Sequence, residues 1–310
     1  MSVARKTLLW ASENDWLKTN VPKWKFVQKA LKKFMPGESS DDAITESLKF
    51  LAYNIPTVFT KLGENINNIE ESFAVRDHYI AVIDQIADQK LDTEVSLKLT
   101  QIGFDISEEE AFNNFCSIAE RVKTKLGNTL FIDMEGSAYT QRTIDFYKRV
   151  IPIYPNTGIC LQAYLYRTVN DINELINCSP KIRLVKGAYR ESGDIAYPDK
   201  NDVDKNYFEL SKILLRSIKE NNVRTVFATH DSRMIEEIIS EGLRHGLSKS
   251  SIEFQMLYGI KTNYQYDLAK RGFSFRVLIA YGEYWYPWYM RRLAERPANV
   301  WFVVKNFYKK

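Results

Sequence analysis

The sequence predicts an α/β protein built on a (β/α)8 TIM-like barrel with an N-terminal helical arm. Eight short apolar runs, rich in Val, Ile, Leu and Phe, recur between residues 56 and 279. Each run is followed by a longer segment whose apolar residues have helical spacing. Strands that alternate with helices form right-handed βαβ units and a parallel sheet, and eight units over about 250 residues match a closed barrel. A doubly wound open sheet is the alternative that this pattern leaves open.

Each apolar run is short enough for a buried strand and is bounded by polar or turn-forming residues. The intervals between consecutive runs leave room for one helix each. We therefore expect strands at residues 56–62, 94–100, 129–135, 158–164, 181–187, 223–230, 251–257 and 273–279.

The first 55 residues differ from this pattern, because they are aromatic-rich, have a helical texture and are interrupted by Pro36-Gly37. A helix-start signal at Ser40-Asp41 then precedes an amphipathic run. We divide the chain into an N-terminal helical segment, residues 1–55, and a barrel domain, residues 56–310.

Composition limits the possible functions. The chain has 310 residues, with 43 Lys and Arg against 39 Asp and Glu, and is 45% hydrophobic, which is typical of a globular protein with a large core. A net charge of +4 is too small to indicate nucleic-acid binding, and we expect none. No apolar run reaches the ~18 residues of a membrane-spanning helix, and the N-terminus lacks a secretory signal. Three cysteines without CxxC spacing indicate free thiols, so we expect a cytoplasmic protein.

Several common catalytic motifs are absent. The 13 glycines form no GxGxxG, GxxxxGK[ST] or GxSxG motif, which argues against dinucleotide fingerprints, P-loops and hydrolase elbows. The three histidines, His78, His230 and His245, lack metal-ligand spacing, so we expect no metal.

Polar residues lie within or just after the apolar runs. In a (β/α)8 barrel the carboxyl ends of the strands form the active-site mouth, so polar residues at these positions indicate a site. One such residue could be an ordinary hydrogen-bonded member of the interior, but a set in successive units favours chemistry. Cations, one acid, amides and a histidine suit an anionic ligand, an organic cofactor, or both. The set is Lys98, Asp133, Gln162, Lys186, His230 and Gln255.

The segment RLVKGAYRE at 183–191 is one of two more specific constellations. Arg183 and Lys186 are three residues apart, so they face opposite sides unless the strand ends between them. The small residues of the Lys186–Ala188 loop allow a backbone to approach a planar ligand. Lys186 reads equally well as a rim lysine or as a site residue.

The second constellation is YGEYWYPWYMRRLAER at 281–296, in which six aromatic residues precede Arg291 and Arg292. Two neighbouring arginines on a helix could converge on one carboxylate, for which the planar guanidinium is well suited. The alternative is a surface pair in which Glu295 neutralises Arg291 one turn away.

Taken together, these segments resemble the proline dehydrogenase family, whose members are flavin enzymes with a (β/α)8 barrel. The resemblance extends from about residue 57 to 306, and its motifs appear in the family's order. They are SLKLT at Lys98, DMEG from Asp133, LQAY at Gln162, RLVKGAY from Arg183, ATHD from Ala228, IEFQML ending at Leu257 and RRLAE from Arg291.

The resemblance implies FAD as the cofactor and assigns residues to it. Arg183 and Gln162 would contact the flavin ring, and the Arg183 guanidinium would stabilise the reduced, anionic flavin. The other implied cofactor contacts are Met134, Lys186, Gly187, Ala188, Thr229 and His230.

The resemblance also implies L-proline as the substrate. Arg291 and Arg292 would bind its carboxylate, with Lys98 nearby. Asp133 would organise these cations, and Asp133 and Arg183 would be the catalytic residues. Tyr189 and Leu257 would pack against the substrate ring. Glu295 would pair with Lys98 or with an arginine of the cluster without touching the substrate.

One departure from the family pattern bears on the choice of substrate, and a lesser one is Ala280, where the family commonly has proline. Leu278 stands where the family usually has a tyrosine against the substrate ring, so a preference for hydroxyproline or another cyclic imino acid stays open. The residues alone also permit a Schiff-base lyase that uses Lys186 or Lys98, or a barrel that only binds a ligand.

The implied reaction is the first step of proline catabolism. Hydride would pass from C5 of proline to N5 of FAD, giving 1-pyrroline-5-carboxylate, and the electrons would pass on to a quinone. A quinone in a membrane would require peripheral contact at the membrane's inner face, for which the C-terminal segment VWFVVKNFYKK is a candidate.

Overall fold

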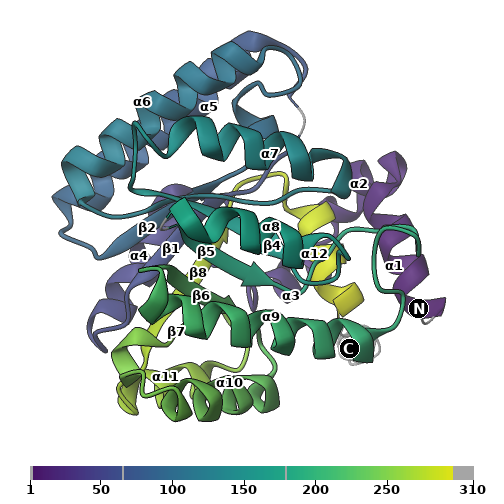
Figure 1. Cartoon of the computed structure of the whole chain (residues 1–310). Helices are drawn as coiled ribbons and strands as arrows, with labels where there is room; N and C mark the ends of the chain where they lie inside the picture. Colours follow the sequence, from purple (N-terminus) through teal and green to yellow (C-terminus); the bar gives the residue numbers. More distant parts are fainter. Residues whose placement is uncertain (1–2, 65, 179, 296–310) are drawn as a thin grey trace.

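The computed structural model describes residues 3–64, 66–178 and 180–295. Its eight strands form one closed parallel barrel in sequence order, in which β1 (Thr57–Lys61) pairs with β2 (Thr93–Leu97) and with β8 (Ser274–Tyr281) (Figure 1). The pairing of the first strand with the last closes the sheet. The predicted barrel is therefore confirmed, and the open-sheet alternative is wrong.

Every strand falls on one of the expected apolar runs. The register between β2 and its neighbour aligns Ser96 with Phe131, so these side chains share the barrel interior. The remaining strands are β3 (Leu130–Ile132), β4 (Thr157–Gln162), β5 (Lys181–Val185), β6 (Arg224–Ala228) and β7 (Glu253–Leu257).

Amphipathic helices follow the strands and cover the outside of the barrel (Figure 1). Several of them begin at a side chain that accepts a hydrogen bond from the first turn, such as Asn68, Ser107 and Asp231. The helices are α5 (Ile69–Asp88), α6 (Glu108–Leu126), α7 (Ser137–Val150), α8 (Thr168–Leu175), α9 (Lys200–Glu220), α10 (Ser232–Arg244), α11 (Thr262–Lys270) and α12 (Trp285–Glu295), with 3-10 turns at η2 (Leu99–Ile102), η3 (Ile176–Cys178) and η4 (Lys249–Ser251).

The N-terminal segment packs in two places. The helices α1 (Val3–Glu13), α2 (Asp15–Asn20) and α3 (Lys25–Leu31), with the turn η1 (Val21–Lys23), form an arm beside α12 (Figure 1). A separate apolar cluster joins arm and helix through Val27, Leu31, Trp285 and Tyr289, among others.

The helix α4 (Ser40–Leu51) instead packs into the main core through Ala43 and Phe50. Its Ser47 hydroxyl lies 2.6 Å from the hydroxyl of Thr57 at the start of β1. The helix begins one residue earlier than the sequence signal suggested: Ser39, not Ser40, is the N-cap, and it forms a capping box with Asp42.

The centre of the barrel is filled by one aromatic ring. Phe131 occupies the space that Gly158 leaves open, because a Cβ at Gly158 would lie 2.4 Å from that ring. The guanidinium carbon of Arg183 lies 4.2 Å from the ring centroid and that of Arg224 lies 5.7 Å from it. Phe131 thus contacts both of these buried or partly buried cations.

A cluster of ion-paired side chains lies at the amino-terminal end of the barrel. Arg224 donates to both oxygens of Glu253 at 2.9 and 2.7 Å and to Glu94 at 2.5 Å. The Glu94 side chain has no exposed area, and burial raises its pKa above the ordinary value. Arg276 lies 3.7 Å from each of the two glutamates. Residues at this end of such barrels serve stability.

We expect Arg224→Met to destabilise the protein by about 3–5 kcal/mol, because it removes the hydrogen-bonded partner of Glu94 and leaves two carboxylates to the more distant Arg276. Urea unfolding at pH 7 measures this loss. Restoring neutrality with Glu94→Gln in the same chain should recover part of it, and Arg233→Met, at a side chain that is 89% exposed, should change stability little. A loss below about 1 kcal/mol for Arg224→Met would contradict this account of the cluster.

Candidate active site

A cavity of about 560 Å³ opens at the carboxyl ends of the strands. The structure brings the predicted site residues together there, although the role of each stays a prediction. Glu295 ends α12, and its side chain lies outside the described part of the chain. The predicted residues that line the cavity are Lys98, Asp133, Met134, Gln162, Arg183, Lys186, Gly187, Ala188, Tyr189, Thr229, His230, Leu257, Leu278, Arg291 and Arg292.

Arg183 lies at the bottom of this cavity, with 2% of its side chain exposed. Its Nη1 donates to Asp133 Oδ1 at 2.9 Å, and both terminal nitrogens donate to the Ser96 hydroxyl at 3.2 Å. The hydroxyl in turn donates to Asp133 Oδ1 at 2.6 Å. A buried guanidinium needs such partners, because its desolvation is otherwise costly.

Arg183 Nε and Gln162 Oε1 are two buried polar atoms without a hydrogen-bond partner among the described residues, and Gln255 Oε1, on another side chain that lines the cavity, is a third. Gln162 uses its other atom, Nε2, to donate to the backbone oxygen of Glu135 at 3.2 Å. Buried polar groups are almost always paired, so one unused donor and one unused acceptor indicate a polar ligand at this place. A flavin ring, which carries both acceptors and an N–H donor along one edge, fits this set.

The loop after β5 contributes the small residues of the cavity wall. The strand ends at Val185, so Arg183 and Lys186 both line the cavity although they are three residues apart. Gly187 has φ of +106°, and a Cβ there would lie 2.2 Å from the Tyr164 ring. Only glycine fits this turn, because its missing side chain gives the Tyr164 ring room to pack against the loop backbone.

Ion pairs and one hydrogen bond fix the far side of the cavity. The Lys186 ammonium lies 2.5 Å from Asp204 and 3.3 Å from Asp231. His230 accepts a hydrogen bond at Nε2 from the backbone N–H of Leu257 at 2.9 Å. This contact requires a neutral imidazole whose proton is on Nδ1.

The helix α12 brings Arg291 and Arg292 to the same cavity. The Arg291 side chain is 11% exposed, and its guanidinium carbon lies 4.9 Å from the centroid of the Tyr189 ring. Burial would lower the pKa of Arg291, but Tyr189 and Glu64 raise it above its ordinary value. The guanidinium is thus charged and positioned to receive an anion.

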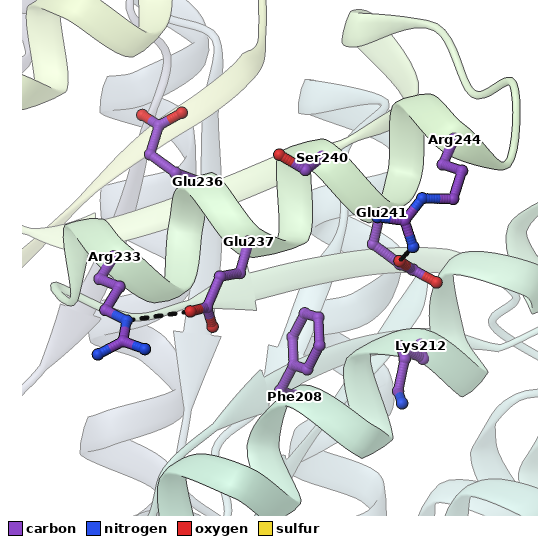
Figure 2. Close-up of a pocket in the computed structure, with 8 residues that line it drawn as sticks. All are labelled: Phe208, Lys212, Arg233, Glu236, Glu237, Ser240, Glu241 and Arg244. Carbon is purple, nitrogen blue, oxygen red and sulfur yellow. Dashed lines mark hydrogen bonds and ion pairs between the residues drawn. The ribbon is translucent and has the colours of Figure 1, made fainter.

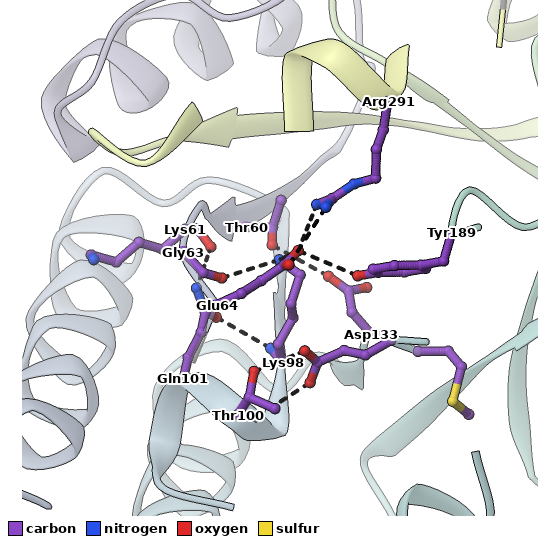
Figure 3. A network of polar contacts seen from close by, with 12 residues as sticks. Thr60, Lys61, Gly63, Glu64, Lys98, Thr100, Gln101, Asp133, Tyr189 and Arg291 are labelled. Carbon is purple, nitrogen blue, oxygen red and sulfur yellow. Dashed lines mark hydrogen bonds and ion pairs between the residues drawn. The ribbon is translucent and has the colours of Figure 1, made fainter. Parts of the chain in front are cut away.

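The carboxylate that faces Arg291 is Glu64, which the sequence analysis missed (Figure 3). Its Oε1 accepts from Arg291 Nη2 at 2.5 Å and from the Tyr189 hydroxyl at 3.3 Å, and it lies 3.8 Å from Lys98 Nζ. Burial would raise the pKa of Glu64, but Lys98 and Arg291 lower it. The signal was an acid just after the first expected strand, TKLGEN, at the same end of the barrel as the other site residues.

Lys98 is held by a polar network at the end of β2 (Figure 3). The Gln101 side chain accepts from the Lys98 backbone N–H at 3.3 Å and donates to the Lys61 carbonyl at 2.8 Å, which ties two strand ends together. Beneath this network the Glu135 carboxylate accepts from the Thr100 hydroxyl at 2.8 Å. Burial raises the pKa of Glu135 to about 7, against the opposing effect of Lys98.

Leu278 lines the cavity where the sequence comparison led us to expect a family tyrosine. The nearby Tyr281 does not replace it, because its ring packs against Phe59 and its hydroxyl lies 3.1 Å from His78 Nε2. The wall at Leu278 is therefore apolar.

A second hollow of about 530 Å³ lies outside the barrel between α9 and α10 (Figure 2). Its charged side chains pair with close neighbours: Arg233 with Glu237 at 3.0 Å, and Arg244 with Glu241. The predicted residues named above line the barrel mouth instead, so the mouth is the candidate site.

In residues 3–64, 66–178 and 180–295, no helix has both the length and the apolar character to cross a membrane. Over the same ranges, no group of three or more His, Cys, Asp or Glu side chains could hold a metal ion.

Comparisons with known proteins identify the family of this chain. Residues 44–305 match the family model described as proline dehydrogenase. The chain is similar to "Proline dehydrogenase 2" of Bacillus subtilis subsp. natto, with 37% identity over 100% of both chains. It is also similar to "Proline dehydrogenase" of Deinococcus radiodurans, with 34% identity over 89% of both chains.

Solved structures share the fold. Proline utilization A from Bdellovibrio bacteriovorus, inactivated by N-propargylglycine, matches with a TM-score of 0.80 and 23% identity, over 94% of this chain and 38% of that one. Proline utilization A from Bradyrhizobium japonicum matches with a TM-score of 0.70 and 20% identity, over 88% and 31%. From the family match and the full-length similarity to curated relatives, we conclude that this chain belongs to the proline dehydrogenase family.

Proposed function

We propose that this chain oxidises L-proline to 1-pyrroline-5-carboxylate, the first step of proline catabolism, with FAD bound in the barrel mouth. The observation that carries the proposal is one shared cavity. The unused donor of Arg183 and the paired Arg291 and Arg292 open onto the same hollow, in a chain of the proline dehydrogenase family. A cofactor and an anionic substrate could therefore meet there.

The cofactor part of the proposal rests on the fit of the cavity to a flavin. Gln162 and Arg183 supply an unused acceptor and donor, and the Lys186–Ala188 loop lines the same cavity. When bound, FAD would accept at N5 the hydride that leaves C5 of the substrate ring. The residues that would hold it are Met134, Gln162, Arg183, Lys186, Gly187, Ala188, Thr229 and His230.

Arg183 would stabilise negative charge that develops on the flavin. Its guanidinium is buried and preorganised, so its field acts at low effective dielectric and needs no rearrangement during the reaction. Asp133 would hold that guanidinium in place, since it pairs with Nη1. These two residues form the catalytic pair of the proposal.

Substrate binding would depend on Arg291 and Arg292, which would grip the carboxylate, with Lys98 adding positive charge. Glu64 already pairs with Arg291, so an arriving carboxylate must share or replace that contact. Tyr189, Leu257 and Leu278 would wall the ring and hold C5 toward the cofactor. Positioning of this kind supplies a large part of the barrier reduction in such reactions.

The geometry does not favour the Schiff-base alternative. Lys186 is paired with Asp204 and Asp231, and Lys98 lies near Glu64, whereas a Schiff base needs a free amine. The apolar wall at Leu278 also gives no donor that would recognise a ring hydroxyl, so L-proline remains the proposed substrate over hydroxyproline.

A quinone would take the electrons onward, and we infer peripheral contact with a membrane at its inner face. The C-terminal segment first considered for this contact lies outside the described residues. Within them, the arm offers a surface: Trp10, Trp16 and Trp24 are 53%, 63% and 42% exposed. Residues 1–35 contain eight Lys or Arg but only two Asp or Glu. Exposed tryptophan beside basic residues is typical of surfaces that bind anionic lipid.

Anaerobic addition of L-proline to the purified yellow protein should bleach the flavin absorbance near 450 nm, about the usual maximum of oxidised flavin, if the proposed oxidation occurs. A stopped-flow spectrum measures the change, with D-proline as the control. If the protein is purified colourless, it is first reconstituted with FAD. A bound flavin that L-proline then fails to reduce would refute the proposal.

Arg291→Met should raise the KM for proline about a hundredfold while the protein stays yellow, because loss of a charge-assisted carboxylate contact costs about 2–3 kcal/mol. Steady-state kinetics with an artificial acceptor measure the effect. Arg233→Met, at an exposed side chain outside the mouth, is the matched control. An unchanged KM would rule out the carboxylate role of Arg291.

The full-length protein should co-sediment with vesicles that contain phosphatidylglycerol and not with vesicles of phosphatidylcholine alone. Replacing Trp10 and Trp16 with serine should weaken this binding about tenfold, since two aromatic anchors are lost. Tyr53→Ser, at an aromatic side chain that follows α4 and is 62% exposed, should leave it unchanged. Equal binding by the arm variant and the wild type would argue against the arm as the contact.

A further inference from the structure

Ser96 is a fully buried residue of β2 that the preceding account of the reaction does not use. Its hydroxyl lies between the acid and the cation of the proposed catalytic pair. It donates to Asp133 Oδ1 at 2.6 Å and accepts from Arg183 Nη1 and Nη2 at 3.2 Å each. A hydroxyl has one donor and two acceptor positions, so these three contacts use all of them.

The contacts of Ser96 determine how Arg183 meets Asp133. The pair is single-pronged, because only Nη1 bonds to Asp133, and only to Oδ1. Arginine and a carboxylate otherwise favour a two-pronged pair with two parallel hydrogen bonds. Ser96 occupies Nη2 and shares Oδ1, and the other carboxylate oxygen lies 3.4 Å from the Thr60 hydroxyl.

The orientation that results leaves one edge of the guanidinium unused. The Phe131 ring fixes the plane of Arg183 from one side, at 4.2 Å from its centroid. Ser96 fixes the rotation of the fork within that plane, and Nε is left without a partner among the described residues. If the guanidinium turned to pair with Asp133 through two nitrogens, the carboxylate would neutralise more of its charge. The positive potential that Arg183 exerts on the cavity would then be weaker.

We propose that Ser96 is a positioning residue that keeps the Arg183–Asp133 pair single-pronged, so that Arg183 acts on the cofactor. The inference rests on the proposed function, because it concerns the field that Arg183 exerts on bound flavin. It predicts that loss of the hydroxyl makes the flavin harder to reduce while the proline carboxylate still binds normally.

Two variants of the full-length holoenzyme test this role. Ser96→Ala removes the hydroxyl, and Ser96→Cys keeps a side chain of similar shape with only a weak donor and acceptor. Both should show a more negative flavin midpoint potential, and a kcat about tenfold lower with KM for proline changed less than about twofold. Spectroelectrochemical titration gives the potential, which a purely structural role would not move.

Thr225→Val is the matched control, because Thr225 is a buried hydroxyl on β6 with no partner in the described part of the chain. It should keep the wild-type potential and kcat. If both Ser96 variants also keep them, or if Thr225→Val shifts the potential equally, the inference is overturned. Failure of both Ser96 variants to fold, judged by thermal unfolding, would overturn it as well, since Ser96 would then be a structural residue of the strand.

The wild-type protein separates this inference from the proposed function. If L-proline does not reduce the bound flavin of the wild type, the proposed function fails. If it does, and the Ser96 variants match the wild type, only the role of Ser96 fails.

Discussion

The buried guanidinium of Arg183 is the constraint on which the centre of this barrel depends. A charge with 2% of its side chain exposed must be neutralised where it lies, and Asp133, Ser96 and the face of Phe131 do this together. Phe131 in turn reaches its position only because Gly158 on the neighbouring strand has no side chain. The chemistry at the mouth therefore rests on a glycine and an aromatic ring deep in the barrel.

The buried arginines at the two ends of the barrel differ in how their hydrogen-bonding groups are paired. At the amino-terminal end, Arg224 is bound by Glu94 and Glu253, so the guanidinium contacts carboxylates on two strands. At the carboxyl-terminal end, Arg183 Nε and Gln162 Oε1 lack partners within the described structure. An unpaired buried polar atom costs stability, and a ligand bound at the proposed site would offset that cost for these two atoms. The hydroxyls of Thr157 and Thr225, at the starts of β4 and β6, also lack partners within the described structure, so it is the cavity together with these atoms that marks the candidate site.

The sequence predicted the barrel and the members of the site because both follow from local pattern. Short apolar runs mark the strands, and polar residues at their ends meet at one mouth whatever the helices do between them. It did not predict Glu64, because a loop's path is set by tertiary contacts such as those with Arg291 and Tyr189, 227 and 125 residues away. Ser96 escaped notice since a serine inside an apolar run reads as ordinary core. Only the register of Ser96 beside Phe131 brings it to Asp133 and Arg183.

The division of the chain at residue 55 has a different meaning once the packing of α12 is considered. This helix presents Arg291 and Arg292 to the cavity, while its aromatic residues are covered by the arm. The Trp285 indole donates to Glu38 at 2.8 Å and the Tyr286 hydroxyl to the Ala11 carbonyl at 3.2 Å. The N-terminal segment therefore packs directly against the helix that carries the proposed carboxylate contacts, and a boundary at residue 55 separates two parts that share one apolar cluster.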